Sequence, residues 1–125
     1  MNPFGTITLD WASIFDILSV YNVKINLCSG EKAIANEKLF SNLAEEIKRQ
    51  IGHDNFFQII GSNFYEDLYN CNLEIFILVD KVKESPELGK EIDEKNFERH
   101  KIKKALQKHF FGSDLNEIKV GYEKN

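Results

Sequence analysis

Two short series of polar residues flank apolar rows in the second half of the chain, and they are the first candidates for a site. Asn72 and Asp80 are eight positions apart, so on a helix they share one flank. Asn96, Arg99 and Lys103 are spaced three and four apart and share a face in the same way. If the two helices pair antiparallel, the series meet, and we expect Asp80 and Arg99 to form an ion pair that Asn72 or Asn96 completes.

Arg99 stands out because the chain has two arginines and fourteen lysines. An arginine beside core positions indicates a requirement for its planar fork, which fits a carboxylate or a phosphate. We favour a structural pair with Asp80 that fixes how the helices are aligned. The alternatives are a site in which Arg99, Lys103 and Lys24 hold a small anionic ligand, and a strip of side chains that simply faces solvent.

Other kinds of chemistry have little support in the sequence. The three histidines, His53, His100 and His109, lack the spacing of a ligand pair, and no HExxH motif is present. Cys71 falls on an apolar row, which predicts a core residue rather than a nucleophile. The phosphate-binding loops and the hydrolase elbow are also missing from the sequence. We therefore expect no catalytic residue, no metal and no cofactor.

The composition is that of one ordinary folded domain over residues 1–125, because 42% of the residues are apolar and 29% are charged. No apolar run approaches the roughly 18 residues of a membrane helix, and no leader pattern is recognisable, so we expect a cytoplasmic protein without membrane contact. A net charge of -4 disfavours nucleic acid as a partner. The two cysteines lack a CxxC spacing and predict no disulfide framework.

Apolar residues at helical spacing indicate the elements that must position these side chains. Helices are predicted over about residues 10–28, 31–50, 54–60, 63–85 and 86–111. The β-branched residues within 20–27 leave a strand open there. In the tail, Ile118, Val120 and Tyr122 alternate with polar residues, which is typical of an extended strand or a docked arm.

These elements predict an all-α fold, an elongated antiparallel bundle of about four helices with a short extended C-terminal arm. A helix of about 23 residues is about 35 Å long, which nearly equals the diameter of a compact chain of this size. Such a bundle buries a thin core. The aromatic residues left over, Phe56, Phe57, Phe110 and Phe111, therefore predict a homodimer.

Residues 16–25, 68–85 and 95–122 resemble a family of small, uncharacterised helical proteins encoded near bacterial polysaccharide and glycosyltransferase genes. The family's pattern of polar, aromatic and glycine positions falls here on Asp16, Ser19, Lys24, Asn72, Phe76, Asp80, Asn96, Arg99, Lys103, Gly112, Ser113, Glu117, Lys119 and Tyr122. The chain departs from it at Val79, where the family has a carboxylate, and at Phe76, where it has tryptophan. The resemblance implies a context in bacterial polysaccharide biosynthesis and no established reaction.

Two functional hypotheses follow from the sequence. The first is a non-enzymatic helical accessory or protein-interaction module, which includes a dimer or another protein partner. The alternative is a small all-helical enzyme or anionic-ligand binder, comparable to a chorismate-mutase bundle, in which Arg99 and Lys103 hold the anion. A site of that kind needs several converging arginines, and only Arg99 is well placed for it, which favours the first hypothesis.

Overall fold

The computed structural model describes residues 10–112, and the regular structure in this range is all helix, with no strand. The elements are α1 (Trp11–Leu27), α2 (Gly30–Ile51), α3 (His53–Ile60), α4 (Asn63–Lys81), the 3-10 turn η1 (Pro86–Leu88) and α5 (Gly89–Phe111). The all-α prediction is confirmed, and residues 20–27, which left a strand open, belong to α1. Residues 10–112 form five α-helices, and the short one, α3, is the helix predicted at about 54–60. The expected arm at 118–122 lies outside the described residues.

The helix ends follow local chemistry that the sequence provides. The Asp10 carboxylate accepts a hydrogen bond from the backbone N–H of Ser13 at 2.9 Å and so caps α1. Ser62 caps α4 in the same manner, accepting from the backbone N–H of Tyr65 at 3.3 Å. α5 ends at Gly112, whose φ of 71° lies in the left-handed region that glycine adopts without strain.

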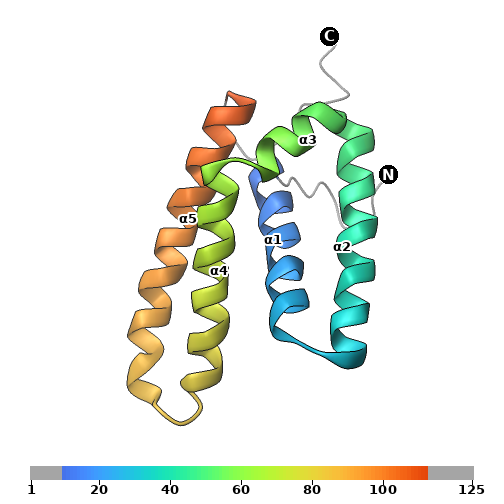
Figure 1. The fold of residues 1–125 in the computed structure, drawn as a ribbon. Helices are drawn as coiled ribbons and strands as arrows, with labels where there is room; N and C mark the ends of the chain where they lie inside the picture. Colours follow the sequence, from blue (N-terminus) through green and yellow to red (C-terminus); the bar gives the residue numbers. More distant parts are fainter. Residues whose placement is uncertain (1–9, 113–125) are drawn as a thin grey trace, which may run out of the picture.

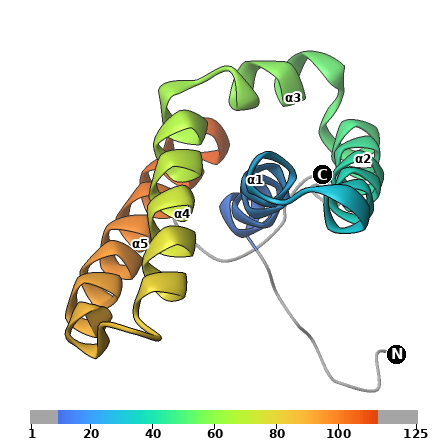
Figure 2. The same ribbon diagram turned by 60° about the horizontal axis from the view of Figure 1, so that its bottom comes forward.

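Two helical hairpins make up the fold, α1 with α2 and α4 with α5, and α3 links them at one end (Figure 1). Turning the molecule shows α1 between α2 on one side and the α4–α5 pair on the other (Figure 2). α1 accordingly contacts α2, α4 and α5. α1 is therefore the helix of the first hairpin that makes most of the contacts with α4 and α5.

The apolar core surrounds the first half of α1. Its buried members are Trp11, Ala12, Phe15, Leu18, Ala44, Ile47, Phe56, Ile59, Tyr65, Leu68 and Leu106. Of the four aromatic residues expected to remain uncovered, Phe56 is buried, and Phe110 and Phe111 pack against this core. Only Phe57 is exposed. Three of the four are therefore buried in the core or packed against it.

The distal half of the α4–α5 hairpin has a different character. The two helices continue beyond the end of α1 (Figure 1), and none of residues 73–105 is buried. Ile77, Val79 and Phe97 are exposed apolar side chains on this part. The hairpin therefore provides one face against α1 and a free end beside it. Within residues 10–112, no helix has the length and apolar character needed to cross a membrane.

Candidate functional site

Asp16 is the centre of a buried polar cluster between the two hairpins. It lies on the face of α1 that meets α4 and α5, and only 5% of the residue is exposed. One carboxylate oxygen, Oδ1, accepts a hydrogen bond from Asn72 Nδ2 of α4 at 2.8 Å. A buried carboxylate is costly unless it is paired and hydrogen-bonded, so its partners determine what the cluster can do.

Asn72 and Ser19 complete the hydrogen bonding on the α1–α4 side. The Asn72 amide also donates to Ser19 Oγ at 2.8 Å. The Ser19 hydroxyl in turn donates to the backbone carbonyl of Asp16, one turn earlier in α1, at 2.7 Å. Asn72 and Ser19 are 5% and 0% exposed, so this part of the cluster is closed to solvent and internally satisfied.

Two cations of α5 approach the other oxygen of the same carboxylate. Arg99 Nε lies 3.3 Å and Lys103 Nζ 3.9 Å from Asp16 Oδ2. Residues four apart on a helix lie one above the other, which explains why one carboxylate can meet both. Arg99 Nη1 additionally donates to Asn96 Oδ1 at 3.2 Å. We call Asp16, Ser19, Asn72, Arg99 and Lys103 the Asp16 cluster.

A pocket of about 350 Å³ opens beside this cluster, between α1 and the α4–α5 hairpin. Its lining residues are Val20, Val23, Asn72, Ile75, Phe76, Val79, Asp80, Lys83 and Arg99. The walls are mostly apolar, and two cations and one carboxylate stand among them. We call it the Arg99 pocket, since Arg99 belongs to both the cluster and the lining.

The expected ion pair between Asp80 and Arg99 was wrong. Arg99 pairs with Asp16 of α1, whereas Asp80 is exposed and lies 3.7 Å from Lys83, in the turn that follows α4. The reason is that α1 presents a buried carboxylate closer to Arg99 than the solvated flank of α4 does. Asp80 and Arg99 still face the same pocket.

Some of the other predicted site residues belong to the Asp16 cluster, and others do not. Asn72, Arg99 and Lys103 lie together, and the exposed Asn96 supports the Arg99 guanidinium. Lys24 is half-buried on α1, and no hydrogen bond or ion pair joins it to the cluster in the described part of the chain. Lys24 is therefore not part of the arrangement that surrounds Asp16.

Sequence reasoning missed Gln107, which is 2% exposed on α5. Its Oε1 accepts a hydrogen bond from the backbone N–H of Ala12, one of the free donors of the first turn of α1, at 3.0 Å. A signal was available, because Gln107 follows Lys103 by four positions and so continues the Arg99–Lys103 face. This face of α5 therefore contacts α1 at two places, at the start of α1 through Gln107 and further along α1 through Arg99 and Lys103.

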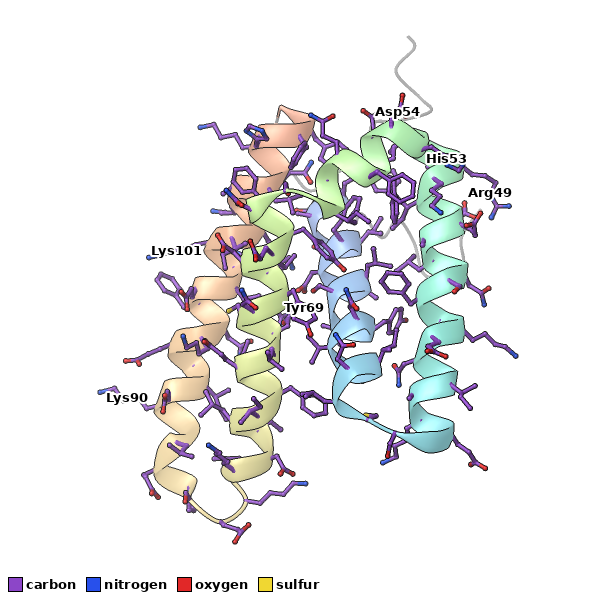
Figure 3. The ribbon with its side chains drawn as sticks, in the orientation of Figure 1. Arg49, His53, Asp54, Tyr69, Lys90 and Lys101 are labelled. Atoms are coloured by element: carbon purple, nitrogen blue, oxygen red, sulfur yellow. The ribbon has the colours of Figure 1, made fainter. Side chains whose placement is uncertain are left out.

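A second set of polar contacts joins α1 to α4 on a neighbouring face. Asn26 Nδ2 donates to the Tyr69 hydroxyl at 2.7 Å, and Asn22 Nδ2 lies 3.4 Å from the Tyr65 hydroxyl. Figure 3 shows Tyr69 between the two helices, whereas Lys90 and Lys101 extend away from the outer side of α5. Lys90 and Lys101 can therefore be replaced without affecting the Asp16 cluster.

Cys71, next to Asn72 on α4, is a weak nucleophile. Burial raises the pKa of the Cys71 thiol to about 11, and its Sγ lies 3.2 Å from the Lys95 carbonyl oxygen, so the thiolate that a nucleophile requires is disfavoured. Within residues 10–112, no group of three or more histidine, cysteine, aspartate or glutamate side chains is arranged to hold a metal ion. What the site does offer is unbalanced charge. The cluster and the pocket lining contain two carboxylates and three cations.

Comparison of the chain with models of protein families, with curated proteins and with solved structures finds no match. The geometry of the Asp16 cluster and of the Arg99 pocket is therefore the basis on which a function is argued.

Proposed function

We propose that this protein is a non-enzymatic helical binding module whose Arg99 pocket takes a small organic molecule with one negative charge. One observation carries the proposal. A single buried carboxylate, Asp16, faces two cations, Arg99 and Lys103, and one of these also lines a pocket with apolar walls. The surplus positive charge favours an anion, and the walls favour an apolar body attached to it.

The arrangement of Arg99 supports this proposal. Its Nε is directed at Asp16, its Nη1 donates to Asn96, and 32% of the side chain is exposed. A guanidinium has five N–H donors in a planar fork, so donors remain after these two contacts. Asp16 fixes the orientation of the fork, which lowers the entropy cost of binding a carboxylate in the pocket.

An enzymatic role for the pocket is less well supported. A site of the chorismate-mutase kind uses several arginines on one substrate, but Arg49 lies at the far end of α2 (Figure 3) and pairs with Glu46. Arg99 is then the only arginine at the pocket. The arrangement supports retention of a ligand with one charge more than it supports stabilisation of a multiply charged transition state.

Benzoate and its neutral analogue benzamide are suitable probes, because they differ in charge and match in shape. At ten times its Kd, benzoate should raise the free energy of unfolding by about 1.4 kcal/mol, which appears as a higher melting temperature. Benzamide should have a much weaker effect. Arg99→Met should abolish the benzoate effect. Lys90→Met, which removes an outward-facing cation of the same helix, should preserve it. Equal responses to the two probes, or a full response in Arg99→Met, would contradict the proposal.

Docking of a protein partner is a second candidate function. It is favoured by the exposed Ile77, Val79 and Phe97 on the free end of the α4–α5 hairpin. The homodimer, the cytoplasmic location and the polysaccharide context stay predictions from the sequence. Light scattering over a range of concentrations tests the dimer, which requires twice the chain mass of 14.5 kDa.

A further inference from the structure

The apolar wall of the Arg99 pocket is a stripe along α4. The residues of α4 that line the pocket alternate in spacing between three and one, which places them on one face of the helix. They are Asn72, Ile75, Phe76, Val79 and Asp80. Ile75 and Phe76 are half-buried, and Val79 is 47% exposed. The wall therefore becomes more open with distance from Asn72.

The anion-binding end of this stripe is at Asn72. The Asn72 amide and the Arg99 guanidinium meet the two oxygens of one carboxylate, that of Asp16, at 2.8 Å and 3.3 Å. Their polar groups are therefore close together. A ligand carboxylate that binds the free donors of Arg99 starts at this end of the stripe.

The opposite end of the stripe has charges that water already solvates. Asp80 and Lys83 lie 3.7 Å apart, and their side chains are 79% and 74% exposed. A pair of this kind interacts weakly, both internally and with a ligand. The pocket thus has one effective charged end, from which an apolar wall extends.

The length of this wall indicates the shape of the apolar body. Val79 follows Asn72 by seven positions, which is a rise of about 10 Å on a helix. An extended alkyl chain advances about 1.25 Å per carbon, so about eight carbons beyond the carboxylate are needed to reach Val79. A compact ring next to Arg99 would contact the first part of the wall and leave Val79 uncovered.

We propose that the ligand of the Arg99 pocket is a straight-chain aliphatic monocarboxylate of about eight to ten carbons. Its carboxylate binds Arg99, and its alkyl chain lies along Ile75, Phe76 and Val79. This inference rests on the proposed function and specifies the apolar body that the ligand carries. Benzoate contacts the same end of the pocket and stays a valid probe of Arg99.

The test is a calorimetric titration of the full chain with hexanoate, octanoate and the octanoate isomer 2-propylpentanoate. Octanoate adds two methylenes to hexanoate, and its Kd should be lower by about 4- to 15-fold, because each buried methylene tightens binding by about 2- to 4-fold. The isomer has the same charge and the same number of carbons, but its chains are short. It should bind no more tightly than hexanoate.

Val79 and Ile77 provide a matched pair of variants on α4. They are 47% and 39% exposed, and Val79 lines the pocket whereas Ile77 does not. Val79→Ser should raise the Kd of octanoate several-fold and leave that of hexanoate unchanged, since hexanoate reaches about 6 Å, the level of Phe76. Ile77→Ser should leave both Kd values unchanged. Arg99→Met should abolish the binding of all three acids, and far-UV circular dichroism confirms that the helices of each variant persist.

Two results would overturn this inference and leave the proposed function in place. Equal affinities for hexanoate and octanoate would show that the chain does not follow the wall, and equal affinities for octanoate and its isomer would show that volume matters rather than length. Octanoate binding that persists in Arg99→Met, while the benzoate effect is lost, would assign the chain to another apolar surface and also overturn the inference. Failure of benzoate and of every aliphatic acid to bind would contradict the proposed function itself.

Discussion

Phe15 and Asp16 are neighbours in α1, and both are buried, but they face different surroundings. Phe15 is 0% exposed within the apolar core, close to Phe56 of α3. Asp16 turns to the α4–α5 hairpin and meets Asn72, Arg99 and Lys103 there. α1 therefore contacts the apolar core through hydrophobic packing and the α4–α5 hairpin through hydrogen bonds and ion pairs.

The difference teaches how stability and alignment are divided in this fold. Burial of apolar surface contributes about 25 cal/mol per Å², and it tolerates small shifts of one helix along another. The Asp16 cluster contributes less, because desolvation of its charges offsets their attraction. Its hydrogen bonds are satisfied in one alignment only, so a shift of α1 by one turn would leave Asp16 and Asn72 unpaired. The apolar side stabilises the fold, and the polar side selects its alignment.

The largest effect should come from the apolar side. Phe15→Ala leaves a cavity at a fully buried position and should lower the free energy of unfolding by about 3 to 5 kcal/mol. Phe97→Ala removes the same ring from a side chain that is 63% exposed and should change stability by less than about 0.5 kcal/mol. Urea denaturation measures both. Similar losses in the two variants would mean that the described core is not what stabilises the protein.

On the polar side, Asp16→Asn should cost less than Phe15→Ala. The change leaves Arg99 and Lys103 facing each other without a counter-ion, and we expect a loss of about 1 to 3 kcal/mol. The lower part of this range is expected because about a third of the Arg99 side chain is exposed and screened by solvent. Asp80→Asn, the same change on an exposed carboxylate, should stay within about 0.5 kcal/mol of wild type.

A double-mutant cycle then identifies the partner of Arg99. Asp16→Asn and Arg99→Met should be coupled by about 0.5 to 3 kcal/mol, because they remove the two ends of one ion pair. The corresponding cycle with Asp80→Asn should show additivity, since Asp80 pairs with Lys83 instead. Coupling to Asp80 and none to Asp16 would restore the pairing expected from the sequence and contradict the structure.

The sequence predicted the helices better than it predicted their contacts, and the two sides of α1 explain why. Helical periodicity is a local property, so the apolar spacing alone indicated each helix. Contacts between α1 and α5 depend on how the hairpins are placed, which periodicity does not encode. The pairing of Arg99 was accordingly assigned to Asp80, an acid on the preceding long helix, rather than to Asp16 on a helix far away in the chain.

The candidate site was predictable where polar residues interrupt an apolar row on one helix. Asn72, Arg99 and Lys103 were found in this way, and the family resemblance added Asp16 and Ser19 without indicating what they contact. The buried role of Gln107 was not recognisable from its type, since glutamine is usually exposed. Its spacing from Lys103 was the one local signal.

The smallest expected effect is on the pH dependence of stability, and it concerns Tyr65. The ring of Tyr65 belongs to the core, whereas its hydroxyl faces Asn22 on the polar side. Burial raises the pKa of the Tyr65 phenol to about 12, against an ordinary value of 10.0. The folded protein therefore holds this proton more tightly than the unfolded chain does, and the stabilisation is fully present below pH 10. It is lost as the pH rises through about 12.

At pH 11, ionisation of the unfolded chain at this position should already lower stability by about 1 kcal/mol. Tyr65→Phe keeps the ring in the core and removes the titrating group, so the stability of this variant should fall less between pH 9 and 11 than that of wild type. Tyr69→Phe, which removes a phenol from the more exposed neighbouring position on α4, serves as the control and should leave the alkaline loss in place. If Tyr65→Phe loses as much stability as wild type over this range, the hydroxyl of Tyr65 is solvated, and the boundary between the apolar and polar sides of α1 lies deeper than the structure places it.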